Sequence, residues 1–129
     1  MKVRVCKIFD FHASHILHNA EMDEETNRHV FGKCNQLHGH TYVLEVMCEG
    51  EPVEETGMVV NFRDIKALVR PFIDQHLEHK HLNDFVSLPT AENILLAIAS
   101  DLGIELHKIG VCKMRLWETK TSYAEVDLG

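Results

Sequence analysis

The segment from residue 38 to residue 50, HGHTYVLEVMCEG, constrains the fold more than any other part of the chain. Apolar and polar residues alternate along it, which is typical of a β-strand with one buried face. On such a strand His38 and His40 lie side by side, on the face that continues with Tyr42. The chain must therefore form a sheet that carries two histidines on one face.

Three further strands and two helices are expected. Residues 2–15 alternate in strand fashion, and residues 108–128 give two strands around Lys120. Asn61 is the expected N-cap of a helix that Pro71 should kink or break. Thr90 caps a second helix, for which Gly103 is the expected stop. The polar, acidic residues 18–33 form either a long connection or a short helix.

The order strand, strand, helix, helix, strand, strand predicts an α+β fold, in which helices cover one face of an antiparallel sheet. The other face of this sheet has apolar residues of its own. In so small a domain that face is expected to meet another subunit. Its expected members are Val43, Met47, Val111 and Trp117.

Composition narrows the class of protein. The chain has 129 residues, which suits one domain spanning 1–129, and 45% of them are hydrophobic. A net charge of −7 argues against a nucleic-acid partner. No apolar run is long enough for a membrane span, and the N-terminus has no signal-peptide pattern. A cytoplasmic location with four reduced cysteines is the expectation.

Three histidines are candidate metal ligands. His15 shares the apolar face of the first strand, and antiparallel pairing would bring it beside His38 and His40. Three neutral imidazoles with an open fourth position are typical of catalytic Zn²⁺, and nitrogen-rich ligation favours zinc over magnesium or calcium. A chance pair of histidines on a half-buried strand remains the alternative. His12 and four other histidines are expected to be surface or capping residues.

Two further groups are candidates for proton transfer. Cys34 follows Lys33, a cation that would lower the pKa of a nearby thiol. It is a catalytic group, a buried inert thiol, or a fourth ligand that makes the zinc site structural. Glu78 can orient His79 and raise its basicity, but only at a helix end or in a loop, because adjacent residues diverge on a helix. A solvated charged helix end is the alternative.

Glu118 ends the row Cys112, Met114, Leu116 on one face of its strand. A carboxylate there is costly to bury unless it is paired. Its two oxygens suit a ligand with two parallel N–H donors, such as a pterin or guanine ring. A solvent-facing or lysine-paired glutamate is the alternative.

The segments FDFHASHIL, CNQLHGHTYVLEV, GMVVNF, LEHKHLN, PTAEN and WET, taken in this order, resemble the 6-pyruvoyl-tetrahydropterin synthase superfamily. Within it they are most similar to the 6-carboxy-tetrahydropterin synthase family of queuosine and deazapurine biosynthesis. The resemblance implies the tunnelling fold, a four-stranded antiparallel sheet with two helices on one face in the order ββααββ. It also implies a homo-hexamer made of two trimers, with active sites at subunit interfaces.

The resemblance implies a lyase reaction on 7,8-dihydroneopterin triphosphate and a role for each site residue. Zinc on His15, His38 and His40 would acidify the side-chain hydroxyls of the substrate. Cys34 and His79 would transfer protons, with His79 oriented by Glu78 and contributed by an adjacent subunit. The remaining implied residues bind the pterin: Glu118 anchors its amino-pyrimidine edge, with Thr90 and Glu92 nearby.

Some features depart from the family pattern. The family usually has aspartate where this chain has Glu78, and often also where it has Asn61. Asn61 and the acidic segment 23–35 are similar to the pyruvoyl branch, whereas three residues between Cys34 and His38 are the carboxy-forming pattern. The triphosphate could meet Arg28, Lys33, Lys80 or His81.

Several activities therefore stay open. The leading one forms 6-carboxy-tetrahydropterin, with loss of triphosphate and acetaldehyde. The nearest rival forms 6-pyruvoyl-tetrahydropterin by triphosphate elimination alone. An aldolase-like variant typically has glutamate in place of the cysteine, so Cys34 argues against it. A non-catalytic pterin-binding module with a structural Cys/His zinc site is the alternative from another class.

Overall fold

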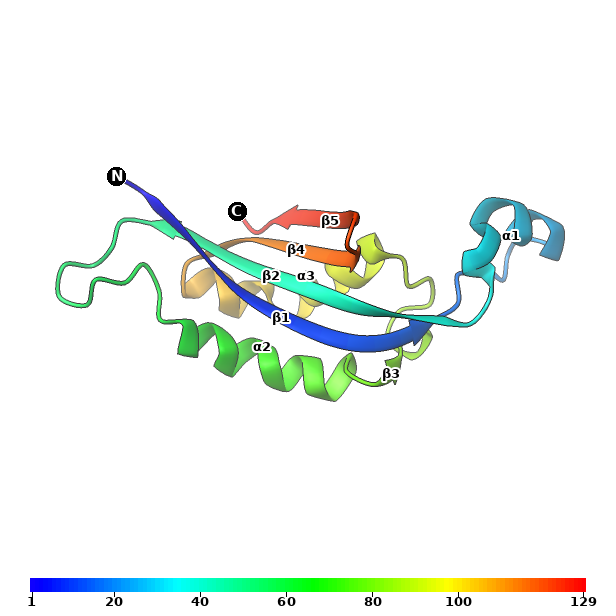
Figure 1. Ribbon diagram of the computed structural model, residues 1–129, viewed down its shortest axis with the longest axis horizontal. Coiled ribbons are helices and arrows are strands. Elements are labelled where there is room, and N and C mark those ends of the chain that lie inside the picture. The colour runs from blue at the N-terminus through cyan, green and yellow to red at the C-terminus, as the bar shows by residue number, and fades with distance from the viewer.

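A five-stranded sheet forms the centre of the protein (Figure 1). The computed structural model describes residues 1–129. The strand order is β3-β1-β2-β4-β5. Neighbouring strands are antiparallel except β3, which runs parallel to β1 at one edge. The strands are β1 (Val3–His15), β2 (His38–Gly50), β3 (Lys80–His81), β4 (Val111–Thr119) and β5 (Ser122–Asp127).

Two long helices, α2 (Phe62–His76) and α3 (Ala91–Lys108), cover one face of the sheet (Figure 1). A third helix, α1 (Glu24–Phe31), lies beyond the ends of β1 and β2, in the excursion that joins them. Two 3₁₀ turns, η1 (Gly32–Asn35) and η2 (Leu82–Asp84), follow α1 and β3. No helix is long and apolar enough to cross a membrane.

The core lies between the sheet and the two long helices. The strands contribute alternate residues, and the rings of Phe11 and Tyr42 stack with their centroids 4.9 Å apart. Ile65, Val69 and Ile73 face them from α2, each fully buried. This spacing of four residues is that of one helix face.

The α+β class is as expected, but the number of elements differs from the expected ββααββ order. The sheet has five strands rather than four, and three helices accompany it. The additional strand β3 has only two residues, too few to show alternation in the sequence. The polar segment 18–33 contains the short helix α1, one of its two expected forms.

Asn61 and Thr90 cap α2 and α3 as expected, with side-chain oxygens accepting from Arg63 N–H and Asn93 N–H. The helix α2 is not broken at Pro71. Gly103 does not stop α3, which continues to Lys108. Five further residues let α3 bury Leu106, and the chain turns instead at Gly110, whose φ is 98°.

A register shift between β2 and β4 changes which side chains of β4 are buried. It falls where Cys48 pairs with Val111 and Met47 with Lys113. Val111 is therefore fully buried on the helix-covered face, not on the outer face as expected. Cys112 leaves the expected row, and its thiol points to the carbonyl oxygen of Met47 at 3.5 Å.

Candidate active site and metal centre

The three candidate metal ligands meet at one end of the β1–β2 hairpin. His15 pairs directly with His38, and His40 pairs with Ala13. All three imidazoles lie on the helix-covered face, where they continue the buried row that includes Tyr42. One ligand nitrogen from each lies within 4.8 Å of the other two. The clustering predicted from the sequence is thus present in the fold.

Backbone carbonyls set the orientation of two of these rings. His15 Nδ1 donates to the carbonyl oxygen of Pro89 at 2.8 Å, and His38 Nδ1 donates to that of Gln36 at 2.6 Å. A carbonyl only accepts, so each neutral ring carries its hydrogen on Nδ1 and has a lone pair on Nε2. The two Nε2 atoms are 2.8 Å apart. Two lone pairs at this separation favour a shared cation.

His40 adds the third nitrogen. Its Nε2 is buried and has no hydrogen-bond partner, and the nearest acidic oxygen, Glu118 Oε1, is 4.0 Å away. Burial lowers the pKa of His40. It also lowers that of His15, whose side chain is fully buried, despite the hydrogen bond to Pro89. Neutral rings with converging lone pairs are what a metal ion requires.

This donor set fits zinc. Three imidazole nitrogens without a carboxylate among them suit zinc rather than magnesium or calcium. His15 and His38 each have a carbonyl behind the ring, the usual support of a metal-binding histidine. Three protein ligands leave a fourth position of a tetrahedral site open.

Cys34 lies in η1, close in the chain to this cluster but outside it. Its carbonyl oxygen accepts from Leu17 N–H at 2.8 Å, and Asn35 Nδ2 donates to Leu17 O at 3.0 Å. These bonds tie η1 to the residues that follow His15. The thiol is not part of the group of atoms within 4.8 Å. The geometry therefore does not support a structural site closed by Cys34.

Glu78 and His79 lie in the turn after α2. His79 has a φ of 57°, unusual for a residue with a side chain, and its N–H donates to His12 O at 2.7 Å. The turn brings His79 Nε2 to 3.3 Å from Glu78 Oε1, so the expected pair forms in a loop rather than on a helix. The side chain of His79 is 80% exposed.

His12 belongs to the same group and is a surface residue, as expected, with its side chain 54% exposed. Its Nδ1 lies 3.0 Å from Glu78 Oε1. Alternation along β1 places His12 on the face opposite His15, so the residues that share a face with the three clustered histidines do not include it. The contact spans 66 residues of sequence. Only the parallel pairing of β3 with β1 brings the two segments together.

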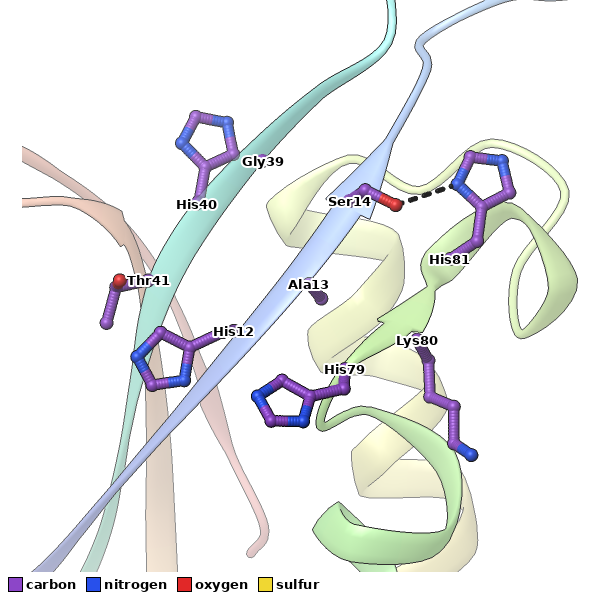
Figure 2. Close-up of a pocket in the computed structure, with 9 residues that line it drawn as sticks. All are labelled: His12, Ala13, Ser14, Gly39, His40, Thr41, His79, Lys80 and His81. Atoms are coloured by element: carbon purple, nitrogen blue, oxygen red, sulfur yellow. Dashed lines mark hydrogen bonds between the residues drawn. The ribbon is translucent and has the colours of Figure 1, made fainter.

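A cavity of ≈ 650 Å³ lies beside this group (Figure 2). The rings of His12 and His79 lie near each other at its wall, with centroids 6.0 Å apart. His81 turns toward Ser14, and its Nδ1 is 3.1 Å from the hydroxyl oxygen. The residues that line the cavity are His12, Ala13, Ser14, Gly39, His40, Thr41, His79, Lys80 and His81.

Of the three expected pterin-binding residues, Glu118 is the one that lies at the cluster, partly buried beside His40. Thr90 caps α3 directly after Pro89, so its hydroxyl is already engaged with Asn93 N–H. Glu92 is exposed in the first turn of α3.

The candidate triphosphate ligands are divided between two places. Lys80 and His81 line the cavity. Arg28 lies on α1, 3.8 Å from Glu24, and Lys33 is exposed in η1.

Fold and site together define a small α+β protein with a cluster of three histidines, able to hold a metal ion, at the end of a strand hairpin. Residues 4–128 match the family described as 6-pyruvoyl tetrahydropterin synthase, and the chain belongs to this family. The resemblance read from the sequence motifs is confirmed at this level.

Relatives with two different names are similar to the chain. A 6-pyruvoyl tetrahydrobiopterin synthase of Drosophila melanogaster is 35% identical over 105 residues, which is 76% of this chain and 62% of the relative. A 6-carboxy-5,6,7,8-tetrahydropterin synthase of Synechocystis is also 35% identical, over 93% of this chain and 89% of the relative. The solved 6-pyruvoyl tetrahydropterin synthase of Caenorhabditis elegans has a TM-score of 0.83 at 26% identity, covering 98% and 96% of the two chains.

Proposed function

We propose that this chain is a zinc-dependent lyase that converts 7,8-dihydroneopterin triphosphate into 6-carboxy-5,6,7,8-tetrahydropterin, with release of triphosphate and acetaldehyde. The observation that carries the proposal is the convergence of three imidazoles around the partnerless Nε2 of His40. Membership of a pterin synthase family supplies the substrate class. The product would feed queuosine and deazapurine biosynthesis.

In this mechanism His15, His38 and His40 hold zinc, which would acidify the hydroxyl groups of the substrate side chain. Glu118 accepts two N–H groups of the pterin ring and so fixes the ring beside His40. Cys34 takes and returns protons at the pterin and side-chain carbons. His79, oriented by Glu78, serves as the second proton-transfer group. Thr90 and Glu92 would stand near the pterin at the start of α3.

The choice of the carboxy product rests on the spacing between Cys34 and His38. Within that gap the carbonyl of Gln36 accepts from His38 Nδ1, so the gap also orients a metal ligand. A longer gap would change the position of the thiol relative to the three histidines. Sequence identity does not separate the two products, because relatives with either name are 35% identical.

The decisive experiment is mass spectrometry of the products formed by zinc-loaded protein from 7,8-dihydroneopterin triphosphate, with acetaldehyde trapped. A carboxy-pterin together with acetaldehyde is the expected result. A pyruvoyl-pterin without acetaldehyde would replace the proposal with the second candidate, 6-pyruvoyl-tetrahydropterin synthase. Asn61, the acidic segment 23–35 and the relatives named for that activity favour this second candidate.

A Cys34→Ala variant separates catalysis from a structural role. Lost turnover with retained zinc and fold would support an enzyme. Lost zinc together with lost fold would instead support a non-catalytic pterin-binding module with a structural site. Zinc-replete protein without turnover on any pterin triphosphate would exclude the enzyme.

The catalytic unit proposed is one domain, 1–129, assembled as a hexamer of two trimers. The proposal that His79 acts in the site of an adjacent subunit draws support from its exposure. The apolar outer residues Val43, Met47 and Trp117 offer a surface for such an assembly. A cytoplasmic location remains a prediction.

A further inference from the structure

One oxygen of Glu78 is approached from three directions. Oε1 accepts from the backbone N–H of His12 at 3.0 Å, and His12 Nδ1 lies 3.0 Å from the same atom. His79 Nε2 is the third neighbour, at 3.3 Å. Two of these three contacts therefore come from a residue of β1 rather than from the turn that carries Glu78.

The chemistry of the groups fixes their roles. A backbone N–H can only donate and a carboxylate can only accept, so His12 Nδ1, which is hydrogen-bonded to Oε1, carries a hydrogen. His79 Nε2 lies 3.3 Å from Oε1 without a hydrogen bond to it, and the negative charge of the carboxylate favours the hydrogen on this nitrogen. His12 is then protonated on Nδ1, and His79 on Nε2. The second nitrogen of His79, Nδ1, is the one left free to exchange a proton.

The carboxylate needs an anchor outside its own turn. Glutamate has several rotatable bonds, and the side chain of Glu78 is 20% exposed, so packing alone does not fix its direction. Burial raises the pKa of Glu78, but the hydrogen bonds from His12 and the nearby His79 outweigh it, and the pKa lies below its usual value. The ionised form that these contacts favour is the one that can orient an imidazole.

The backbone reinforces the arrangement from the other side. His79 N–H donates to His12 O at 2.7 Å, so His12 holds both members of the pair. The side chain of His12 is 54% exposed and packs little apolar surface. His12 and Glu78 are hydrogen-bonded to each other, unlike His40, whose Nε2 has no partner. The group therefore needs no metal ion to explain it.

We propose that His12 is a positioning residue: its backbone and ring N–H groups hold the Glu78 carboxylate beside Nε2 of His79, where the negative charge favours the hydrogen on that nitrogen. His79 Nδ1 is thereby kept as the nitrogen that exchanges protons with the substrate. The role of His79 in exchanging protons with the substrate rests on the proposed function. The effect of His12 on which ring nitrogen of His79 carries the hydrogen does not.

Two variants of His12 separate the ring donor from the other properties of the residue. His12→Phe keeps a planar aromatic ring and the backbone N–H but removes the ring donor. His12→Asn restores an N–H donor at the position of Nδ1. His107→Ala, an exposed histidine near the end of α3, is the matched control. Melting temperatures and zinc content of all three are measured first, and folded, zinc-loaded protein is then assayed.

The expected result is a drop in kcat of about tenfold for His12→Phe, because a hydrogen bond to a charged group is lost, with KM changed by less than about twofold. His12→Asn should recover kcat to within about threefold of the starting protein. Unchanged kcat in His12→Phe would overturn the proposal. So would an asparagine variant as slow as the phenylalanine variant, or a change confined to KM.

A second measurement needs no turnover. Long-range ¹H–¹⁵N NMR of the ring nitrogens should show His79 as the Nε2–H tautomer, and a mixture of tautomers in His12→Phe. The same tautomer in both proteins would overturn the positioning role. If the starting protein turned over no pterin triphosphate but the tautomer shifted as expected, the proposed function would fail while the role of His12 in holding the pair would stand.

Discussion

At the scale of single residues, the environment of His40 gives the strongest indication of a metal-binding site. Its ring nitrogen is buried without a partner, whereas the Nε2 atoms of His15 and His38 face each other at 2.8 Å. A bound cation would resolve both features at once, because it accepts three lone pairs that have no donor to meet.

His40→Ala should therefore weaken zinc binding by more than about a hundredfold, since one of three protein ligands is lost. Zinc per chain, measured by mass spectrometry after dialysis against a weak chelator, checks this expectation. His107→Ala should keep its zinc. Full zinc retention in His40→Ala would mean that the metal binds elsewhere.

Glu78 gives a prediction for the dependence of stability on pH. Its pKa in the folded protein lies below the value of 4.5 for an unperturbed glutamate, so folding favours the ionised form. Its contribution to the free energy of unfolding is then complete above about pH 4.5 and lost as the pH falls through the lower, folded pKa.

Glu78→Gln should accordingly be less stable than the starting protein at pH 7, and the difference should shrink as the pH falls below 4.5 and through the lowered pKa of Glu78. Urea unfolding at several pH values measures it. If the difference in unfolding free energy between the two proteins did not depend on pH, the ionisation of Glu78 would not contribute to stability.

At the scale of elements, α1 depends on one buried side chain. Asn27 Oδ1 accepts from Asn19 N–H at 2.8 Å, and Nδ2 donates to the carbonyl oxygens of Asn19, Met22 and Asp23 at 2.9–3.2 Å. Asn27 is fully buried, so these groups lose their partner if it is removed.

Asn27→Ala should destabilise the segment around α1 by about 2 kcal/mol, which corresponds to about thirtyfold faster amide exchange there. Hydrogen exchange followed by mass spectrometry measures it. Amides of β1 and β2 should keep their protection, and the exposed His29→Ala on the same helix should change little. Uniform loss of protection across the chain would contradict a local role.

The two glycines near the end of α3 should respond in opposite ways to alanine. At Gly103 a Cβ would lie 3.6 Å from Leu128, an ordinary contact, so Gly103→Ala should stabilise the helix by about 0.5–1 kcal/mol. At Gly110, φ is 98°, so Gly110→Ala should destabilise by about 1 kcal/mol or more. Thermal unfolding checks both, and equal shifts in the same direction would refute the distinction.

Local patterns predicted those parts of the fold that depend on neighbours in sequence. Alternation put His38 and His40 on one face, and the caps of α2 and α3 followed from Asn61 and Thr90. Features that depend on pairing between residues far apart in the sequence were not predicted. These are the two-residue strand β3, the register shift that buries Val111, and the contact of His12 with Glu78.

At the scale of the whole molecule, the outer face of the sheet leaves apolar side chains in contact with solvent. Ile8 is 57% exposed on β1, and Val43 and Trp117 lie on the same face of β2 and β4. When a second copy covers a sheet face of this kind, the burial of its apolar side chains stabilises the assembly.

Val43→Glu should therefore reduce the assembly, because a charge at a subunit interface is costly to bury. Light scattering after gel filtration should give the starting protein six times the 14.8 kDa of one chain, and the variant a smaller multiple. Ile104→Glu, at an apolar residue 72% exposed on α3 and away from the outer face of the sheet, is a control for added charge. A hexameric Val43→Glu would show that the subunits meet elsewhere.

The facing positions of His15 and His38 have a consequence for folding. They close the excursion 16–37 at its two ends, and they meet only when β1 and β2 pair in the observed register. A slip by one residue would send one imidazole to the opposite face. Metal binding would thus favour the correct pairing of the two strands. A hairpin in the wrong register could not bind the ion, whereas the correct hairpin would be stabilised by it. Refolding in the presence of metal would then select the productive hairpin from its competitors.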